Sequence, residues 1–363
     1  MRALLGRIDW ILFASLVPLL FAGLITMKSF GGGDDYFFWR QLAWIAASVA
    51  VFFGLSWSDP ALLRSRSTLI GMYGAGLAAL FLLFMTADPI RGASSWFRIG
   101  ALSLEPVEPM KIILALILAK YFSRRHIEIA NIRHIIVSGL YVLLPLILVF
   151  IQPDLGSALI LIALWLATVL ASGISKKHFF ALGILAVAVA VIGWFFVLEP
   201  YQRTRIYSFL DPYLDPRGGG YHTIQAQIAV GAGSFWGRGI GYGSQSRLEF
   251  LPEPETDFMF AAFAEEWGFV GSFLLLIFFG IAVWRILRVG VMGEGNFERL
   301  FAIGFASTII AQFFIHVGMN VGLLPITGLP LPFVSYGGSS LITLFAGLGI
   351  LNSLSKRPLY ERE

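Results

Sequence analysis

The chain contains no cysteine, and only 13% of its 363 residues are charged. Without cysteine it can form neither a disulfide framework nor a thiolate metal site. An ordinary soluble domain has roughly a quarter charged residues, so the low charge content argues against a soluble fold. The formal net charge is +4, but its Lys and Arg residues form no patch or stripe, so nucleic acid is not an expected partner.

Hydrophobic residues make up 57% of the chain. Apolar runs of about twenty residues, the length that spans a bilayer, recur along almost all of it. Arg2 and Arg7 before the apolar run 11–27 resemble a signal peptide, but further runs follow, so we interpret this run as a first transmembrane helix. The sequence predicts an all-α polytopic membrane protein, a single integral membrane domain over 1–363. Ten transmembrane helices are expected near 9–27, 40–57, 67–86, 107–122, 134–151, 155–173, 179–197, 258–284, 299–319 and 335–353.

An even number of spans places both termini on one side of the membrane. Lys and Arg residues are concentrated in the short loops on that side, and the positive-inside rule therefore predicts that both termini are cytoplasmic. The long segment 198–257, between the seventh and eighth spans, is then extracytoplasmic. A loop of this length is usually functional or disordered, and its aromatic content argues against disorder. We expect it to fold back over the outer membrane face, with an amphipathic helix near 221–230.

A charged pair lies near the start of the fourth predicted span, and acidic or basic residues inside a membrane are costly and indicate function by default. Glu108 and Lys111 are three residues apart in the fourth span and therefore share a helix face. They could bind a substrate. Alternatively, they could form a structural ion pair that holds two helices together or caps the start of this helix.

Asp257 stands where the eighth span begins, and two interpretations are open. Thr256 or Asp257 could simply be the N-cap of the helix. Alternatively, the Asp257 carboxylate at the lip of a membrane cavity could act as a general base toward a sugar hydroxyl. Glu253 and Glu255 are the second choice for such a base.

The remaining polar residues give weaker signals. His222 and Gln225 could line one polar face, and His316 could cap the outer end of the ninth span. No set of His, Asp and Glu has a recognisable metal-binding spacing, so no metal site is predicted. The glycines of 237–241 resemble a phosphate-binding loop but lack its flanking strand and helix, and we interpret them as loop flexibility.

Four segments resemble the SEDS family, the membrane proteins of shape, elongation, division and sporulation. They are Trp96-Phe-Arg98 with Glu105-Pro-Val-Glu108-Pro-Met-Lys111, Gln152-Pro-Asp154-Leu-Gly-Ser157, Leu251-Pro-Glu-Pro-Glu-Thr-Asp257-Phe, and the long stretch from Asn320 to Ser339 that contains Gly328-Leu-Pro330-Leu-Pro332 and Ser335-Tyr-Gly-Gly. The resemblance covers essentially the whole chain, and Pro330 is more typical of the elongation branch than of the division branch.

The chain departs from the family pattern in two of these segments. The family usually reads Gln-Pro-Ser-Glu-Phe before the lysine, so Glu108 and Lys111 are kept while Val107 replaces the serine. Any role of that serine hydroxyl is therefore lost here. The usual Pro-Glu-Ala-His-Thr-Asp-Phe becomes Pro-Glu-Pro-Glu-Thr-Asp-Phe, and Asp257 is retained.

The resemblance implies a peptidoglycan glycosyltransferase that acts on lipid II during cell elongation, with Asp257 essential and a class B penicillin-binding protein as the transpeptidase partner. No nucleotide sugar is available outside the cytoplasmic membrane, so a donor activated by its own lipid diphosphate is chemically sensible. Asp257 would deprotonate the GlcNAc 4-hydroxyl, which attacks the MurNAc anomeric carbon with inversion. Lys111, oriented by Glu108, would hold the diphosphate.

The other candidates for the substrate site have alternatives. Arg203 and Arg205 are weaker candidates for the diphosphate charge, and no cofactor is definite although a divalent cation could assist. Asp154, Asn320 and Ser335 could line the cavity or bond across helices in packing.

Two rival functions remain open on the sequence. The chain could be a flippase or transporter of the same lipid, with Glu108, Lys111 and Asp154 along its path. An inverted-repeat transporter, however, would be expected to contain two corresponding broken helices, and none is evident. The chain could also be a scaffold for a partner enzyme, in which case Asp257 would be dispensable.

Overall fold

The computed structural model describes residues 8–354 except 31–34, 87–95, 100–101, 124–131, 199, 217, 219, 249 and 294. Seven helices in the described part are long and apolar enough to cross a membrane, and the apolar helices α8 and α15 are shorter. With the more polar α6, they match the ten predicted spans in order. These helices are α2 (Trp10–Phe30), α3 (Tyr36–Ser56), α5 (Arg66–Thr86), α6 (Val107–Ser123), α7 (Ile132–Ile151), α8 (Leu155–Ala171), α9 (Lys176–Ile192), α13 (Met259–Val291), α14 (Asn296–Asn320) and α15 (Gly338–Leu354).

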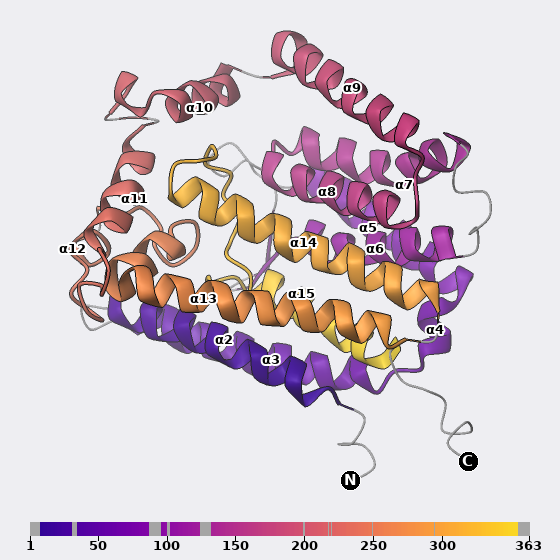
Figure 1. Ribbon diagram of the computed structural model, residues 1–363, viewed down its shortest axis with the longest axis horizontal. Coiled ribbons are helices and arrows are strands. Elements are labelled where there is room, and N and C mark those ends of the chain that lie inside the picture. Colours follow the sequence, from indigo (N-terminus) through magenta and orange to yellow (C-terminus); the bar gives the residue numbers. More distant parts are fainter. Residues whose placement is uncertain are drawn as a thin grey trace.

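The start of α2 and the end of α15 lie at the same end of the helix bundle (Figure 1). We call the opposite end of the bundle the distal end. Shorter elements connect the long helices: α4 (Pro60–Arg64), β1 (Phe97–Ile99), β2 (Leu102–Leu104), η1 (Gly193–Val197), α10 (Pro200–Leu210), η2 (Pro212–Leu214), α11 (Tyr221–Ala232) and α12 (Ser244–Arg247). The helix predicted near 221–230 is present as α11. The hairpin β1–β2, antiparallel with Phe97 opposite Leu104, was not predicted.

Helix α6 is the centre of the bundle and contacts α5, α7, α8, α14 and α15. Most of its side chains are buried, including those of Glu108 and Lys111 near its start. A membrane helix that is surrounded by other helices has no lipid-facing stripe, so it can carry charged residues that a peripheral helix could not. The central position of α6 thus explains how a helix that carries two buried charged residues crosses the bundle.

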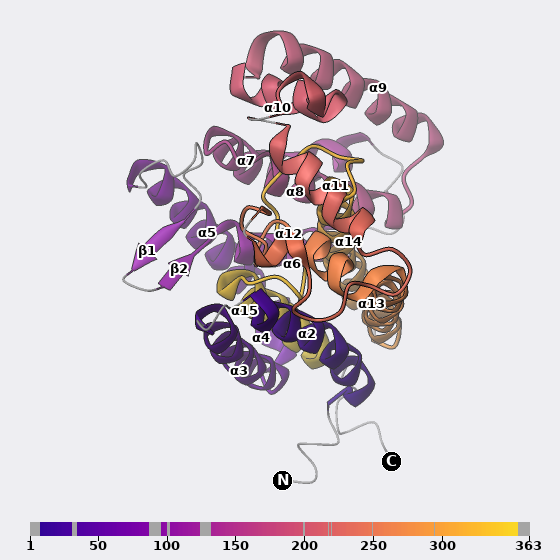
Figure 2. The same ribbon diagram turned by 90° about the vertical axis from the view of Figure 1, so that its left-hand side faces the viewer.

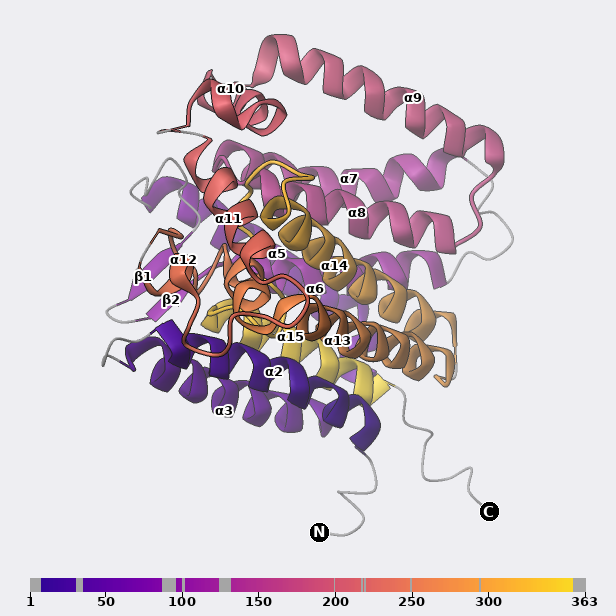
Figure 3. The same cartoon turned by 60° about the vertical axis from the view of Figure 1, so that its left-hand side comes forward.

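Helix α9 has the opposite character. Figures 1 to 3 show it standing apart from the other long helices, with α10 beside its end. None of its described side chains is buried, although the stretch from Lys176 to Phe196 is strongly apolar. Such a surface suits contact with lipid.

Helix α13 is broken at Gly268, where φ is 66° and ψ is −165°. The break interrupts the helical hydrogen bonds there, and the backbone of segment 234–239 inserts to replace them. In a membrane such freed groups must find partners within the protein. The bonds run from Arg238 N to Glu265 O (2.9 Å), Gly239 N to Glu266 O (3.0 Å), Phe269 N to Ser234 O (2.9 Å) and Val270 N to Phe235 O (3.2 Å).

This insertion corrects our interpretation of the glycines at 237–241 as loop flexibility. A Cβ on Gly237 would lie 2.1 Å from the carbonyl oxygen of Glu266, so the close backbone approach requires glycine. Within the described residues, α13 is also the one membrane helix with a non-helical residue inside it. The described part of the chain therefore contains no second broken helix to match it, as an inverted-repeat transporter would.

Ion pairs fasten the end of the bundle that carries the termini. The Arg285 guanidinium on α13 forms a bidentate pair with Asp9, with Nη2 to Oδ2 at 2.7 Å, and the Asp9 N–H donates to Asn352 Oδ1 on α15. Arg64 on α4 pairs with the buried Glu298 of α14 at 2.6 Å. These contacts tie early and late helices together, away from the distal end.

Candidate functional site

Five ionisable side chains meet at the distal end, where α6, α8 and α13 begin. Glu105 lies within electrostatic range of Glu108, Lys111, Asp154 and Asp257. We call these five residues the polar cluster. It unites three of the sequence segments noted above, and four of its members were predicted as site residues.

The Glu108 and Lys111 side chains form an ion pair deep in the bundle. Lys111 Nζ donates to Glu108 Oε1 at 2.8 Å, and both side chains are almost fully buried. The spacing of three residues on one helix brings them together, as predicted. Because a buried charge without its partner is very unfavourable, each side chain requires the other in this arrangement.

Glu105 is the member of the polar cluster that we did not predict as a site residue. It follows β2, is buried, and its N–H donates to Ser339 Oγ of α15 at 3.1 Å. Burial raises the pKa of the Glu105 carboxyl well above its ordinary value; Glu108, Asp154 and Asp257 raise it further, and Lys111 opposes them. This direction favours the neutral acid form of Glu105. The one signal in the sequence was that it occupies the position of the family's usual glutamine.

Asp154 is the N-cap of α8. Its Oδ1 accepts from the Ser157 N–H at 2.9 Å, which satisfies a first-turn donor of the helix. Burial raises the pKa of the Asp154 carboxyl, while the hydrogen bonds from Ser157 and the charge of Lys111 lower it. Asp154 thus combines a structural cap with a place in the cluster.

Asp257 is half-buried and lies immediately before α13. The N-cap of that helix is Phe258, which offers no side-chain oxygen, so the prediction that Thr256 or Asp257 is the N-cap was wrong. A Cβ built on Gly328 would lie 3.7 Å from Asp257 Oδ2, so the carboxylate faces the segment before α15. Asp257 is thus at the surface of the bundle's distal end rather than in its core.

Asn320 and Ser335 hold the backbone beside Asp257. Asn320 Nδ2 donates to the Asp257 carbonyl oxygen at 3.0 Å, and Ser335 Oγ donates to the Thr256 carbonyl oxygen at 2.8 Å. Both residues are buried. Of our two interpretations, cavity lining and helix packing, these bonds favour packing around the site.

The other candidate residues lie elsewhere. Arg203 is on α10, where its guanidinium donates to the Phe195 carbonyl oxygen at 3.3 Å, and Figures 1 to 3 show α10 beside α9 rather than at α6 or α8. The structure therefore does not bring Arg203 into the polar cluster. The side chain of Arg205 lies outside the described residues. His222 is exposed at the start of α11 with its ring 6.3 Å from that of Phe258.

Of the alternative bases, Glu253 belongs to the turn before α13. Its φ is 45°, its carbonyl oxygen accepts from the Thr256 N–H at 3.1 Å, and its carboxylate contacts the Thr256 hydroxyl at 3.3 Å. The carbonyl oxygen of Glu255 accepts from the Tyr336 N–H at 2.8 Å. Glu253 therefore shapes the turn that presents Asp257.

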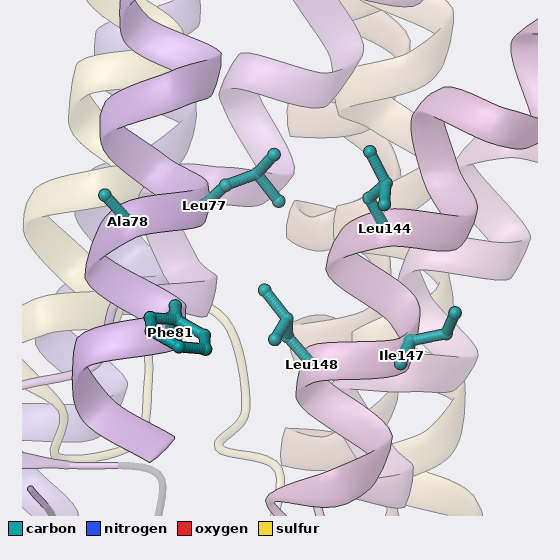
Figure 4. Close-up of a pocket in the computed structure, with 6 residues that line it drawn as sticks. All are labelled: Leu77, Ala78, Phe81, Leu144, Ile147 and Leu148. Carbon is teal, nitrogen blue, oxygen red and sulfur yellow. The ribbon is translucent and has the colours of Figure 1, made fainter. Parts of the chain in front are cut away.

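In the part of the chain that the structure describes, no group of three or more His, Cys, Asp or Glu residues is arranged to hold a metal ion. A cavity of about 370 Å³ lies between α5 and α7, and Figure 4 shows its lining. It is lined by Leu77, Ala78, Phe81, Leu144, Ile147 and Leu148. A cavity with this lining can accept hydrocarbon but offers no group for sugar chemistry, so the polar cluster remains the candidate active site.

Comparison with known proteins places this geometry in a family. The sequence profile of the Cell cycle protein family of FtsW, RodA and SpoVE matches residues 3–359. The chain belongs to this family. It is 33% identical over 352 residues to the peptidoglycan glycosyltransferase MrdB of Escherichia coli K12, covering 96% of this chain and 93% of that protein. It is 34% identical over 361 residues to stage V sporulation protein E of Bacillus subtilis 168, covering 97% and 98%.

Solved structures agree with the family's fold. A chain from a structure of a peptidoglycan synthase complex that coordinates polymerization and crosslinking matches with a TM-score of 0.81 and 32% identity, covering 96% of this chain and 97% of that one. The rod-shape-determining protein RodA of Thermus thermophilus matches with a TM-score of 0.71 and 28% identity, covering 96% and 95%. The all-α polytopic membrane fold and the predicted family are confirmed. The assignment to the elongation branch stays a prediction, because MrdB and the sporulation protein are equally similar.

Proposed function

We propose that the protein is a peptidoglycan glycosyltransferase that polymerises lipid II at the outer face of the bacterial cytoplasmic membrane, with Asp257 as the general base. The observation that carries the proposal is the placement of Asp257, a half-buried carboxylate on a fixed backbone at the distal end, near the other four residues of the polar cluster. The family relation to a peptidoglycan glycosyltransferase over nearly the whole chain supports the same activity. Cytoplasmic termini, which the positive-inside rule predicts, would put the distal end outside.

In the proposed reaction, the Asp257 carboxylate accepts the proton of the GlcNAc 4-hydroxyl of one lipid II molecule. The hydroxyl oxygen attacks the anomeric carbon of the MurNAc of the other, from the face opposite the leaving group. The bond from that carbon to the diphosphate oxygen breaks, and undecaprenyl diphosphate leaves with the electron pair. One new glycosidic bond forms with inversion, and Asp257 then releases its proton to water.

The buried Lys111 has a definite place in this proposal. It supplies the one positive charge within the polar cluster, where Glu105, Glu108, Asp154 and Asp257 supply carboxyl groups. A favourable field for an incoming diphosphate therefore depends on Lys111 remaining charged and on Glu105 remaining neutral. A divalent cation brought by the substrate would add to it.

The decisive experiment measures glycan polymer made from purified lipid II by the protein in detergent, with and without a class B penicillin-binding protein, the transpeptidase partner that we propose. We expect Asp257→Ala and Asp257→Asn to lower the rate roughly 10²- to 10⁴-fold, as loss of a general base does. Glu253→Gln is the matched control, because it changes a neighbouring carboxylate in the same turn and should keep most of the activity.

Each outcome discriminates between functions. Equal polymer from the native protein and folded Asp257→Ala would place the base elsewhere. If neither produces polymer while the partner is active, the flippase or scaffold function takes the place of the proposed one, and a lipid II translocation assay in vesicles separates those two.

A further inference from the structure

The N-terminus of α13 is capped by residues of another helix. A helix start leaves its first N–H groups without helical partners, and the N-cap side chain usually binds those of the second or third helical residue. Phe258 cannot do so. Instead the Phe260 N–H donates to His316 Nε2 at 3.4 Å, and the Ala261 N–H donates to Asn320 Oδ1 at 3.0 Å. The capping that one of our two interpretations gave to Thr256 or Asp257 is therefore performed from α14.

The hydrogen bonds of His316 fix its ring. Its Nδ1 lies 2.7 Å from the Leu329 carbonyl oxygen, and a carbonyl can only accept, so Nδ1 carries the proton. Nε2 is then the acceptor that the Phe260 N–H needs. His316 is completely buried, and it joins the start of α13 to the segment before α15.

Asn320 acts on both sides of Phe258. Its Oδ1 caps α13, while its Nδ2 donates to the Asp257 carbonyl oxygen at 3.0 Å and to the His316 carbonyl oxygen at 2.8 Å. The two preceding carbonyl oxygens are also occupied, that of Glu255 by the Tyr336 N–H and that of Thr256 by the Ser335 hydroxyl. The backbone that carries Asp257 is thus held at three successive residues.

We infer that His316 and Asn320 are positioning residues for Asp257: by capping α13 from α14 and holding the Asp257 carbonyl, they set where the carboxylate meets the sugar hydroxyl. This inference rests on the proposed function. A general base must be within hydrogen-bond reach of its proton, and a displacement of about 1 Å can cost roughly 100-fold in rate. Neither side chain needs to touch the substrate for this role.

Helix α14 offers a matched control in Gln312. It lies on the same face, at a spacing of four residues from His316, and is equally buried. Its Nε2 donates to the Pro330 carbonyl oxygen at 2.9 Å, so Gln312→Ala removes one buried hydrogen bond without touching the backbone at 255–261.

The test compares Asn320→Ala with Gln312→Ala in the polymerisation assay, with rates normalised to folded protein by size-exclusion chromatography. We expect Asn320→Ala to lower kcat roughly 10- to 100-fold with little change in KM, and Gln312→Ala to keep a kcat near that of the native protein. Equal losses of kcat in the two variants, or a change confined to KM, would overturn the inference.

His316 supplies a second test that does not depend on how Asn320→Ala folds. His316→Ala should lower kcat, and His316→Gln, whose amide has both a donor and an acceptor, should recover part of it; no difference between the two would refute the role. Asp257→Ala in the same assay keeps the two proposals distinct. If that variant retains the native rate, the proposed function fails, whereas a loss there together with a normal Asn320→Ala rejects the positioning role alone.

Discussion

Replacing Lys111 by methionine would test whether the buried ion pair serves the fold or the substrate. Methionine fills a similar volume but leaves the Glu108 carboxylate buried without its partner, since the bond of 2.8 Å from Lys111 Nζ is lost. Removal of one partner of a buried pair typically costs about 3–5 kcal/mol. We expect a loss of stability of this size for Lys111→Met.

A second substitution then separates the two roles. Glu108→Gln combined with Lys111→Met removes both charges, and it should recover most of the lost stability because no unpaired charge remains. Lys120→Met is the control at the other end of α6: Lys120 is only half-buried and lies 5.8 Å from the Phe297 ring, so about 1 kcal/mol is at stake.

Stability can be followed by the fluorescence of the ten tryptophans during titration of the purified protein from mild detergent into SDS. The reasoning is refuted if Lys111→Met is no less stable than Lys120→Met, or if the double variant is as unstable as the single one. Once the double variant is folded, its polymerisation rate assigns the role. A native rate makes the pair structural, and a rate lowered at unchanged stability makes Lys111 part of the substrate site.

Two further predictions concern Glu105 and Gly268. Above the ordinary pKa of 4.5, the unfolded chain ionises Glu105 while the folded protein keeps it protonated. The free energy of unfolding should therefore fall as the pH rises, by at most about 1.4 kcal/mol per pH unit. The fall ends where Glu105 ionises in the folded state as well. Glu105→Gln should remove this slope in stability measurements from pH 5 to 8, and an unchanged slope would contradict the assignment. Gly268→Ala should destabilise by roughly 3 kcal/mol or more, because φ is positive and the added Cβ would lie 2.2 Å from Gly237 N. Gly280→Ala, on the same helix with no atom within 4 Å, should be neutral or mildly stabilising in the same SDS titration.

The ten spans could be predicted because each must be apolar over the thickness of a bilayer, whatever it packs against. The pairing of Glu108 with Lys111 was also local, since a spacing of three residues on a helix suffices. The break at Gly268, in contrast, is not determined by the sequence of its own helix. Gly268 is one of several glycines in α13, and nothing in the sequence marks it as the break, which depends on segment 234–239 inserting its backbone.

The sequence predicted most residues of the polar cluster, but it did not predict how each of them is held in place. Asp257 was nominated from its motif, but its relation to α13 was misjudged, because capping by His316 and Asn320 requires helices that are far apart in sequence to meet. Glu105 was overlooked for a similar reason. It is buried beside Ser339 of α15, and its pKa responds to Asp154 and Asp257 as well as to the nearby Glu108. The contributions from α15, Asp154 and Asp257 are not visible from its neighbours in the chain.

At the break in α13, segment 234–239 is joined to the helix by main-chain hydrogen bonds. The residues that follow, 241–246, add bonds from their own N–H groups to the carboxylates of Glu265 and Glu266. A protein or lipid that moved segment 234–239 would pull on residues 259–267, and with them on Asp257, through hydrogen bonds that every amino acid except proline can make. Alanine substitutions within 234–239 would leave these main-chain bonds in place. Amide-to-ester replacement at Arg238 or Gly239 removes the N–H itself, and chemistry of that kind would reveal whether segment 234–239 and the Asp257 carboxylate move together.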